Sequence, residues 1–471
     1  MNAITEINQA ETLNQSLDLL RECYNQQPCL PIEARINNLK LIKQSLIEHR
    51  TQLIEALSND FGCRTEFDTS IADIMPTVAQ INYTLKHLKQ WMKPSKRSAG
   101  LMFMPSKVAV EYQPLGVVGI IAPWNFPVIL SVGPIVTALA AGNRVMLKLS
   151  EFTPKTNQVI TKILSVLPEH ILVIEGAAEV AADFSALPFD HLLFTGSTQV
   201  GRYVAQAAAP NLTPITLELG GKSPVIVAKD SDLDVAVDAV LFGKCLNAGQ
   251  ICVAPDYAFV PKEKVDAFIT RFFERLAVLY PEIEEEGGFT QIINERQYDR
   301  LMAALEEAKQ QGAIVHTKQV TNGADSRLIT PHLMTDVTDD MTIMRDEIFG
   351  PLLPIKPYQD IQEALDYINS KDRPLALYIM STDKSLIQRI VNSTHSGGVG
   401  INETVFHVGA EDAPFGGVGP SGMGHYHGVE GFRTFSHAKT VFHTPAWLGR
   451  IKLLLKSKQK MIKMMGRLFI R

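Results

Sequence analysis

The sequence predicts an α/β protein of two domains, each built on a parallel sheet that helices cover on both faces. Its length of 471 residues suggests two to three domains, at about 150 residues per domain. From residue 117 onward, short runs of Val, Ile and Leu alternate with helical patterns, which is typical of parallel strands buried on both faces. The alternation resumes after a helix-rich stretch at residues 265–310, so we expect a second α/β domain.

The N-terminal part is predicted to be helical. Apolar residues of Ala34–Asp60 mostly fall three or four positions apart, which indicates one long amphipathic helix. A second helix is predicted near Ile71–Met92 and ends before Pro94, because proline cannot continue a helix. The basic, small residues of Ser95–Gly100 then lead to a predicted strand at Lys107–Tyr112.

The uncharged segment Tyr112–Asn143 has the composition of a membrane span. Prolines interrupt it at positions 114, 123, 127 and 134, and proline breaks a lipid-exposed helix. We therefore expect a buried strand at Val117–Ala122, a tight loop at Pro123–Pro127 and a helix entering the core at Ile135–Ala141.

Further elements follow from the same alternation of patterns. The predicted strands are Val145–Leu149, Ile171–Ile174, His191–Phe194, Pro214–Leu219, Pro224–Ala228, Tyr257–Val260 and Leu375–Met380. The predicted helices are Val200–Ala208, Val235–Cys245, Val265–Leu279 and Glu295–Gln310.

Composition excludes several classes of protein. A hydrophobic content of 46% excludes a mostly disordered chain, and a net charge of −5 argues against nucleic-acid binding. Five cysteines without CxxC spacing are too few for a disulfide framework and do not indicate a structural zinc site. The first twenty residues are polar, unlike a secretory signal. We expect a reducing, cytoplasmic setting and no metal site.

The strongest candidate for chemistry is Cys252, in the segment Asn247-Ala-Gly-Gln-Ile-Cys252. This segment follows a predicted helix and precedes a strand, so its cysteine can be exposed in a glycine-containing loop. A thiolate there is a nucleophile. The alternative is a small buried thiol, which is the usual state of a cysteine outside a disulfide.

Glu218, in LELGGKSP, ends a predicted strand between two leucines. Partial burial there raises a carboxyl pKa and suits it to act as a general base. The alternative is a salt-bridged glutamate at a strand end. Gly221-Lys222-Ser223 is similar to part of a phosphate loop, but Thr216 stands where a P-loop needs glycine, and a strand begins at Pro224 instead of a helix.

Two segments at strand ends are candidates for binding a dinucleotide. Gly196 and Ser197 form a turn between a strand and a helix, where backbone amides and the helix dipole can hold a pyrophosphate. Lys148 and Glu151 follow another strand and can hydrogen-bond a ribose. An ordinary strand–helix turn and a solvated loop remain the alternatives.

Three further loops have less specific patterns. In Pro123-Trp-Asn-Phe-Pro127, a rigid turn can direct the Asn125 amide as an oxyanion donor, or can simply pack its Trp. In Asp346–Pro351, Glu347 can accept a hydrogen bond from a sugar hydroxyl or can cap a helix. Five glycines in Pro414–Gly424 suggest a close-packed loop.

Taken in order, the segments PWNFP, FTGSTQVG, LELGGKSP, NAGQIC, DEIFGP and PFGGVGPSG resemble the aldehyde dehydrogenase superfamily. GINETVFH and SGMGHYHG are similar to its class 3 branch, most of all to coniferyl-aldehyde-dehydrogenase-like members. The resemblance implies two Rossmann-like doubly wound domains and a small bridging β element. It implies an NAD(P)-binding domain (1–93 and 114–220), a catalytic domain (221–399), a bridging and oligomerisation part (94–113 and 400–449) and a homodimer.

The resemblance also implies roles for single residues. Cys252 would attack the aldehyde, Asn125 would bind the oxyanion, and Glu218 would activate the water that releases the carboxylic acid. Lys148 and Glu151 would hold the adenosine ribose, Gly196 and Ser197 would lie near the pyrophosphate, and Glu347 and Phe349 near the nicotinamide ribose. The cofactor would be NAD, because Glu151 would repel a 2′-phosphate, although the class 3 branch accepts NADP too.

Phe126 and Phe415 would favour an apolar or aromatic aldehyde, or else pack in the core. The rival functions are a CoA-acylating or hydrolytic cysteine enzyme, and a membrane-associated cofactor-binding protein without turnover. Retention of the reactive positions argues against the second, and Glu218 favours water as the acyl acceptor.

The C-terminal segment 450–471 carries eight basic residues and no acidic one. Its basic residues Lys452, Lys456, Lys460, Lys463, Arg467 and Arg471 fall on one face of a predicted helix. Such a helix can lie on an anionic membrane surface, although it is too charged to span one. It can also dock on the enzyme's own body or fray. Without this segment the net charge is −13, from 37 basic and 50 acidic residues.

Overall fold

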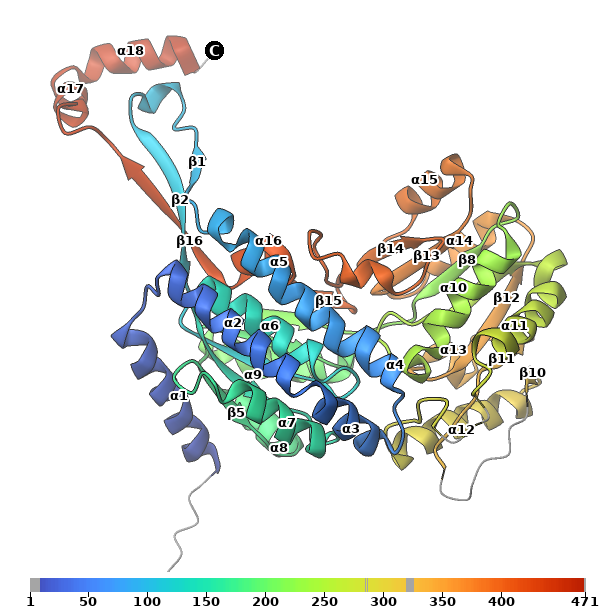
Figure 1. Ribbon diagram of the computed structural model, residues 1–471. Coiled ribbons are helices and arrows are strands. Elements are labelled where there is room, and N and C mark those ends of the chain that lie inside the picture. The colour runs from blue at the N-terminus through green and yellow to red at the C-terminus, as the bar shows by residue number, and fades with distance from the viewer. Residues whose placement is uncertain (1–8, 284, 286, 319–325, 470–471) are drawn as a thin grey trace, which may run out of the picture.

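The computed structural model describes residues 9–283, 285, 287–318 and 326–469. Within that part of the chain, the strands form sheets of six, seven and three strands. The two large sheets lie side by side, and the small sheet projects from one end (Figure 1). The α/β prediction is confirmed.

The six-stranded sheet has the order β15-β7-β6-β3-β4-β5. Five of its strands are parallel, and the short β15 is antiparallel to β7. The strands are β3 (Val117–Ile121), β4 (Arg144–Lys148), β5 (Ile171–Ile174), β6 (His191–Thr195), β7 (Ile215–Glu218) and β15 (Gly422–Met423). The predicted strands in this region agree with the observed ones to within a residue or two.

The seven-stranded sheet has the order β10-β11-β12-β9-β8-β13-β14 and is parallel except at β10. Its strands are β8 (Pro224–Val227), β9 (Tyr257–Pro261), β10 (Ile314–Thr317), β11 (His332–Thr335), β12 (Leu352–Tyr358), β13 (Ala376–Met380) and β14 (Gly398–Ile401). The chain passes from the first sheet to the second between β7 and β8, directly after Glu218.

The three-stranded sheet is antiparallel and joins β1 (Ser95–Arg97), β2 (Lys107–Pro114) and β16 (Ser436–His443). These strands lie within or close to the segments predicted to bridge. The tail forms α17 (Arg450–Lys456) and α18 (Lys458–Phe469) beyond β16. The prediction of one continuous tail helix is therefore wrong, and residues 470–471 of that prediction lie outside the described residues.

The N-terminal prediction needs a second correction. Ala34–Asp60 is not one helix but α2 (Ile32–Glu48) and α3 (Arg50–Phe61), separated at His49. There the backbone leaves the helical region, with φ −98° and ψ 10°, and the His49 ring contacts the carbonyl of Ser45. The spacing of apolar residues alone does not reveal such a break in a helix, because the buried face continues on both sides of it.

The remaining helices cover the sheets. They are α1 (Gln9–Gln26), α4 (Glu66–Thr69), α5 (Met75–Trp91), α6 (Ile129–Ala141), α7 (Pro154–Leu164), α8 (Ala178–Ser185), α9 (Thr198–Ala208), α10 (Leu233–Cys245), α11 (Val265–Leu279), α12 (Glu295–Gln310), α13 (Thr342–Arg345), α14 (Ile361–Asn369), α15 (Lys384–Ser393) and α16 (Gly428–Thr434). Helix α1 was not predicted, and α6 begins at Ile129, before the predicted start at Ile135.

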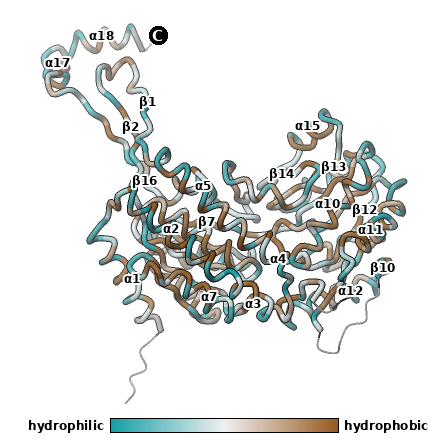
Figure 2. Tube along the Cα trace, in the orientation of Figure 1, coloured by the Kyte–Doolittle hydropathy of each residue, from teal (hydrophilic) through white to brown (hydrophobic). Residues whose placement is uncertain are grey.

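Both faces of the six-stranded sheet are buried. Val118 and Ile120 of β3 pack in one apolar cluster, while Val117 and Ile121 pack in another, as alternation along a strand requires. A third cluster surrounds the seven-stranded sheet. Apolar residues concentrate inside these layers (Figure 2), so the loops at the strand ends rest on rigid supports.

Candidate active site

The carboxyl ends of β3, β4, β6 and β7 meet at one edge of the six-stranded sheet. Ile121 lies opposite both Lys148 and Phe194, and Thr195 lies opposite Glu218. From β3 the chain first adds β4 and β5 on one side, then β6 and β7 on the other. Ligands of open α/β sheets bind where the strand order reverses in this way.

The four predicted adenosine- and pyrophosphate-binding residues lie along this edge. Lys148 ends β4, is buried, and contacts the Glu151 carboxylate at 3.4 Å, while the Glu151 side chain remains 35% exposed. Burial lowers the Lys148 pKa. Gly196 follows β6, and Ser197 is the N-cap of α9. A helix N-terminus and a lysine at the ends of the two strands that flank β3 are suited to a dinucleotide.

Cys252 lies in a loop with unusual backbone geometry after α10. Asn247, Ala248 and Gly249 all have positive φ, at 49°, 52° and 70°. Residues other than glycine, such as Asn247 and Ala248, rarely adopt positive φ. Contacts with the surrounding structure must offset the energetic cost of this conformation. A side chain at Gly249 would meet the Gly350 carbonyl oxygen at 2.5 Å, so the cysteine loop packs directly on the loop that carries Glu347.

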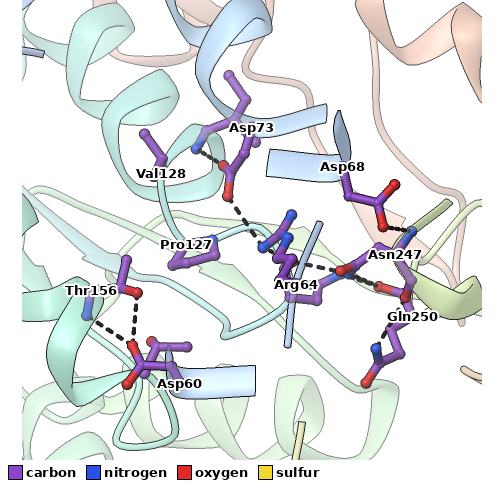
Figure 3. A network of polar contacts seen from close by, with 12 residues as sticks. Asp60, Arg64, Asp68, Asp73, Pro127, Val128, Thr156, Asn247 and Gln250 are labelled. Carbon is purple, nitrogen blue, oxygen red and sulfur yellow. Dashed lines mark hydrogen bonds and ion pairs between the residues drawn. The ribbon is translucent and has the colours of Figure 1, made fainter. Parts of the chain in front are cut away.

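A buried polar network ties Asn125 to the cysteine loop, and Figure 3 shows its members Arg64, Asn247 and Gln250. The Asn125 side-chain amide donates to the Gln250 carbonyl at 3.1 Å. The Asn247 side-chain amide donates to the Asn125 carbonyl at 3.2 Å, and the Arg64 guanidinium donates to the same carbonyl at 3.1 Å. The Pro123–Pro127 turn is therefore fixed two residues from Cys252.

Arg64 anchors this network although its surroundings are apolar. Its guanidinium forms an ion pair with Asp73 at 3.5 Å, with both side chains fully buried. It also lies over the rings of Phe61 and Phe126, at 5.1 and 5.0 Å. Burial raises the Asp73 pKa to about 6 despite the opposing charge. Separating such a buried pair leaves an uncompensated charge, which is strongly unfavourable. The ion pair therefore fixes the position of Arg64.

Glu218 is 3% exposed, and neither carboxyl oxygen has a hydrogen-bond partner. Burial raises its pKa well above the usual value. The sequence alternative of a salt-bridged glutamate does not hold in the structure. Glu218 lies opposite Gly422 in the β7–β15 pair, which places the glycine-rich loop 414–424 beside it.

Glu347 and Phe349 lie in the loop between α13 and β12. Burial raises the Glu347 pKa to about 8, and Asp256 adds to the rise. A side chain at Gly220 would collide with the Glu347 carboxylate, so the glycine permits the close approach of the two loops. Phe349 has φ 50°, and its ring packs edge-on against Trp124 at 5.4 Å.

The pKa of Cys252, the candidate nucleophile, depends on both Glu347 and Glu218. The half-buried Cys252 has its pKa raised to about 12, first by burial and then by the charges of Glu347 and Glu218. The three side chains come from different segments of the chain, and the fold brings them into one electrostatic environment. Burial therefore favours the protonated form of both the Cys252 thiol and the Glu218 carboxyl group.

The two aromatic residues predicted to contact substrate lie in different surroundings. Phe126 is buried in the core of the seven-stranded sheet, against Arg64. Phe415 is partly buried between two apolar clusters and stacks on His427 at 5.2 Å. The His427 Nδ1 atom is buried without a hydrogen-bond partner. Phe415 is therefore the less buried of the two.

Several residues that shape the site were missed in the sequence. Lys222 ion-pairs with Asp256 and donates to the carbonyls of Ile343 and Asp346, which fixes the Glu347 loop. Arg300 donates to the Ile348 carbonyl at 2.7 Å. Asp60 accepts hydrogen bonds from the first turn of α7, next to the Glu151 loop (Figure 3). Lys222 lies within a recognised motif, but nothing in the sequence around Asp60 or Arg64 predicts these contacts.

Comparisons with known proteins agree with this architecture. The model of the aldehyde dehydrogenase family matches residues 6–441. A protein of Pseudomonas aeruginosa named as a probable coniferyl aldehyde dehydrogenase is 47% identical over 468 residues, which cover 99% of this chain and 97% of that protein. The coniferyl aldehyde dehydrogenase of a Pseudomonas species (strain HR199) is 44% identical, with 92% and 91% covered.

Solved structures support the same assignment. The substrate-bound AldH of Staphylococcus aureus has a TM-score of 0.88 at 37% identity, covering 94% of this chain and 99% of that one. A Mycobacterium tuberculosis aldehyde dehydrogenase complexed with NAD⁺ has a TM-score of 0.84 at 27% identity, with 93% and 91% covered. The chain belongs to the aldehyde dehydrogenase family, and the prediction of an aldehyde dehydrogenase is confirmed.

Proposed function

We propose that this enzyme oxidises an apolar or aromatic aldehyde to the carboxylic acid through a covalent intermediate on Cys252, with NAD⁺ as the preferred oxidant. The observation that carries the proposal is the convergence of Cys252, Glu218 and the Asn125 network beside the strand ends of the six-stranded sheet. A nucleophile, a buried base and an amide donor in one place suit acyl chemistry.

The residues at this edge fit a nicotinamide dinucleotide. Lys148, Glu151 and the Gly196–Ser197 turn would hold the adenosine ribose and the pyrophosphate. The buried Glu347 Oε1 atom has no partner in the structure, so it is available to a ribose hydroxyl beside Phe349. When bound, NAD(P)⁺ supplies the hydride acceptor. Glu151 favours NAD⁺, because its charge repels a 2′-phosphate.

The chain's own groups account for the remaining steps. The Cys252 thiol first loses its proton to solvent. Its sulfur then bonds to the aldehyde carbon while the carbonyl π pair moves to oxygen, and the Asn125 amide and the Cys252 backbone N–H stabilise the resulting thiohemiacetal oxyanion. Loss of a hydride leaves a thioester. Glu218 then takes a proton from water, the water oxygen bonds to the acyl carbon, and the thioester breaks to release the acid and the thiol.

The relatives support an aromatic substrate class. Two of them are named for coniferyl aldehyde, a phenolic aldehyde with a conjugated side chain. In this chain Phe415, stacked on His427, offers a flat apolar contact. We therefore place conjugated aromatic aldehydes ahead of short aliphatic ones as substrates of this enzyme.

A screen of NADH and NADPH formation over aliphatic and aromatic aldehydes tests the proposal. Coniferyl aldehyde with NAD⁺ is expected to give the highest kcat/KM. The matched control is Cys252→Ala, which should lose activity with every aldehyde. Turnover in that variant would contradict the nucleophile assignment, and absence of activity with every aldehyde would contradict the function.

We further propose that the chain is divided into domains as the resemblance implies, and that it forms a homodimer in the cytoplasm. The exposed strand β16 supports the dimer, because it lies at an edge of the three-stranded sheet and uncovered edge strands invite pairing. Among the described residues, no helix is long and apolar enough to cross a membrane. We propose that the basic tail 450–471 contacts a membrane surface instead, as its acid-free composition supports.

A further inference from the structure

Exposed apolar side chains gather at the far end of the three-stranded sheet. In the loop between β1 and β2, Leu101 is 84% exposed and Met104 is 64% exposed. Around the tail helices, Trp447, Ile451 and Ile462 are 76%, 74% and 71% exposed. We call residues 101–104 together with 447–467 the distal face. Proteins rarely leave so many large apolar groups together in water, and such patches mark interaction sites.

The loop and the tail form one surface because Arg450 connects them. Its guanidinium donates to the carbonyl oxygens of Phe103 and Met104, at 2.5 and 3.3 Å, and to the Ser106 hydroxyl at 3.0 Å. It also lies over the Phe103 ring at 5.7 Å. The Ser106 and Thr444 hydroxyls are 2.9 Å apart. Figure 1 shows α17 and α18 beside this hairpin and away from the two large sheets.

The charge of the distal face is of one sign. Residues 93–107 carry four basic residues and no acidic one, and residues 431–471 carry ten basic residues and no acidic one. A groove of about 740 Å³ on the tail is lined by the apolar Leu448, Ile451 and Leu455 and the basic Arg450, Lys452 and Lys456. Apolar and cationic groups side by side suit the boundary between lipid headgroups and acyl chains.

We propose that the distal face docks on an anionic lipid bilayer, with the loop Leu101–Met104 and the helices α17 and α18 entering the bilayer surface together. This inference rests on the proposed membrane contact of the tail and adds the hairpin loop as its second half. A second copy of the chain that presents its own distal face is disfavoured as the partner, because the two faces are both positive and repel each other. A nucleic acid would leave the exposed leucine and isoleucine side chains in water.

Co-sedimentation of the full chain with vesicles tests the proposal. The vesicles contain phosphatidylcholine with or without phosphatidylserine. Binding is expected only with phosphatidylserine and should weaken with salt, because each basic residue near the surface contributes about fivefold to partitioning. In Leu101→Ser/Met104→Ser, partitioning should fall roughly tenfold or more, while NADH formation stays unchanged. The matched control is Val278→Ser/Leu279→Ser, which removes two apolar side chains that are 66% and 45% exposed elsewhere.

Deletion of residues 450–471 separates the two proposals. Loss of binding in the deletion, together with wild-type binding of the Leu101/Met104 variant, keeps the tail contact and overturns the joint docking face. Unchanged binding of the deletion overturns the tail contact and, with it, the inference. The proposed docking face is overturned if the wild-type chain does not bind anionic vesicles. It is also overturned if the chain instead self-associates through Leu101 and Met104.

Trp447 gives a direct readout of entry into the bilayer. It is one of three tryptophans and is 76% exposed. Its fluorescence should shift to the blue on binding anionic vesicles, and the shift should be absent in Trp447→Phe and reduced in Leu101→Ser/Met104→Ser. A wild-type spectrum unchanged by vesicles that bind the protein would contradict entry of the distal face.

Discussion

At the scale of single residues, burial raises the pKa of the two groups proposed to act as nucleophile and base. The pKa of Cys252 is raised to about 12, and that of Glu218 is raised well above its usual value. Both must lose a proton to act, as thiolate and as base. The deprotonated fraction of each group grows tenfold per pH unit below its pKa.

We therefore predict that kcat/KM for NADH formation rises with pH between about 6 and 9, by up to about tenfold per unit. The measurement is a pH–rate profile with coniferyl aldehyde, with stability checked at each pH. Activity that is already at its plateau at pH 6 would show that neither raised pKa governs the reaction.

A second prediction at this scale concerns Arg64. Arg64→Met should lower the free energy of unfolding by roughly 3–5 kcal/mol, because Asp73 is left buried without its partner. It should also lower kcat, because the Asn125 carbonyl loses a donor. Urea unfolding and steady-state kinetics measure the two effects. The double variant Arg64→Met/Asp73→Asn should recover part of the stability, and no recovery would contradict the ion-pair explanation.

Residues inside recognisable motifs could be predicted, and their long-range partners could not. Glu218 stood out as a carboxylate between two leucines, and the structure shows it buried. Arg64 and Asp68 follow α3 in a segment without any functional pattern. Asp68 accepts a hydrogen bond from the Asn247 backbone, 179 positions away. Only the tertiary fold creates such contacts, so local sequence carries no signal of them.

At the scale of elements, the Glu347 loop depends on Lys222. Its ammonium group binds the Asp256 carboxylate and two carbonyls of that loop. Lys222→Met should raise the KM for NAD⁺ by roughly tenfold, since hydrogen bonds to a charged group contribute roughly 1.5–3 kcal/mol, and should change kcat less. Lys229→Met is the matched control, because that lysine is 58% exposed and pairs with Glu263 only at 3.9 Å. Equal effects in the two variants would contradict a specific role.

The predicted strands lie within a residue or two of the observed ones, and the predicted helices Val265–Leu279 and Glu295–Gln310 have the observed bounds. Continuous apolar runs such as Ile171–Ile174 gave the observed strand bounds. The break at His49 was missed because α2 and α3 present one continuous buried face, and α1 was missed because its sequence is mostly polar. The division of the tail at Ser457 was missed for a similar reason, since the basic spacing continues through both helices.

At the scale of the whole molecule, the uncovered three-stranded sheet argues for a dimer. The mass of one chain is 52.1 kDa, and light scattering after size exclusion should give about twice that value. The variant that lacks residues 450–471 should remain a dimer, with the mass of two shortened chains. A monomer at micromolar concentration would contradict the dimer, and a dimer lost with the tail would place the contact in the tail.

The charge distribution belongs to the same scale. The tail carries eight basic residues, and the rest of the chain has a net charge of −13. In the proposed docking, an acidic body and a basic distal face would orient the enzyme on an anionic surface. Aldehydes with extended apolar groups partition into bilayers, so docking would place the enzyme where such substrates concentrate.

The central claim is that Cys252 carries an acyl group that Glu218 helps to hydrolyse. The most direct test is intact-mass spectrometry of Glu218→Gln after mixing with NAD⁺ and coniferyl aldehyde. The account predicts one equivalent of NADH per site, followed by little turnover, and a mass increase equal to the coniferyl acyl group on a peptide containing Cys252. Continued NADH formation at the wild-type rate without any adduct would contradict it.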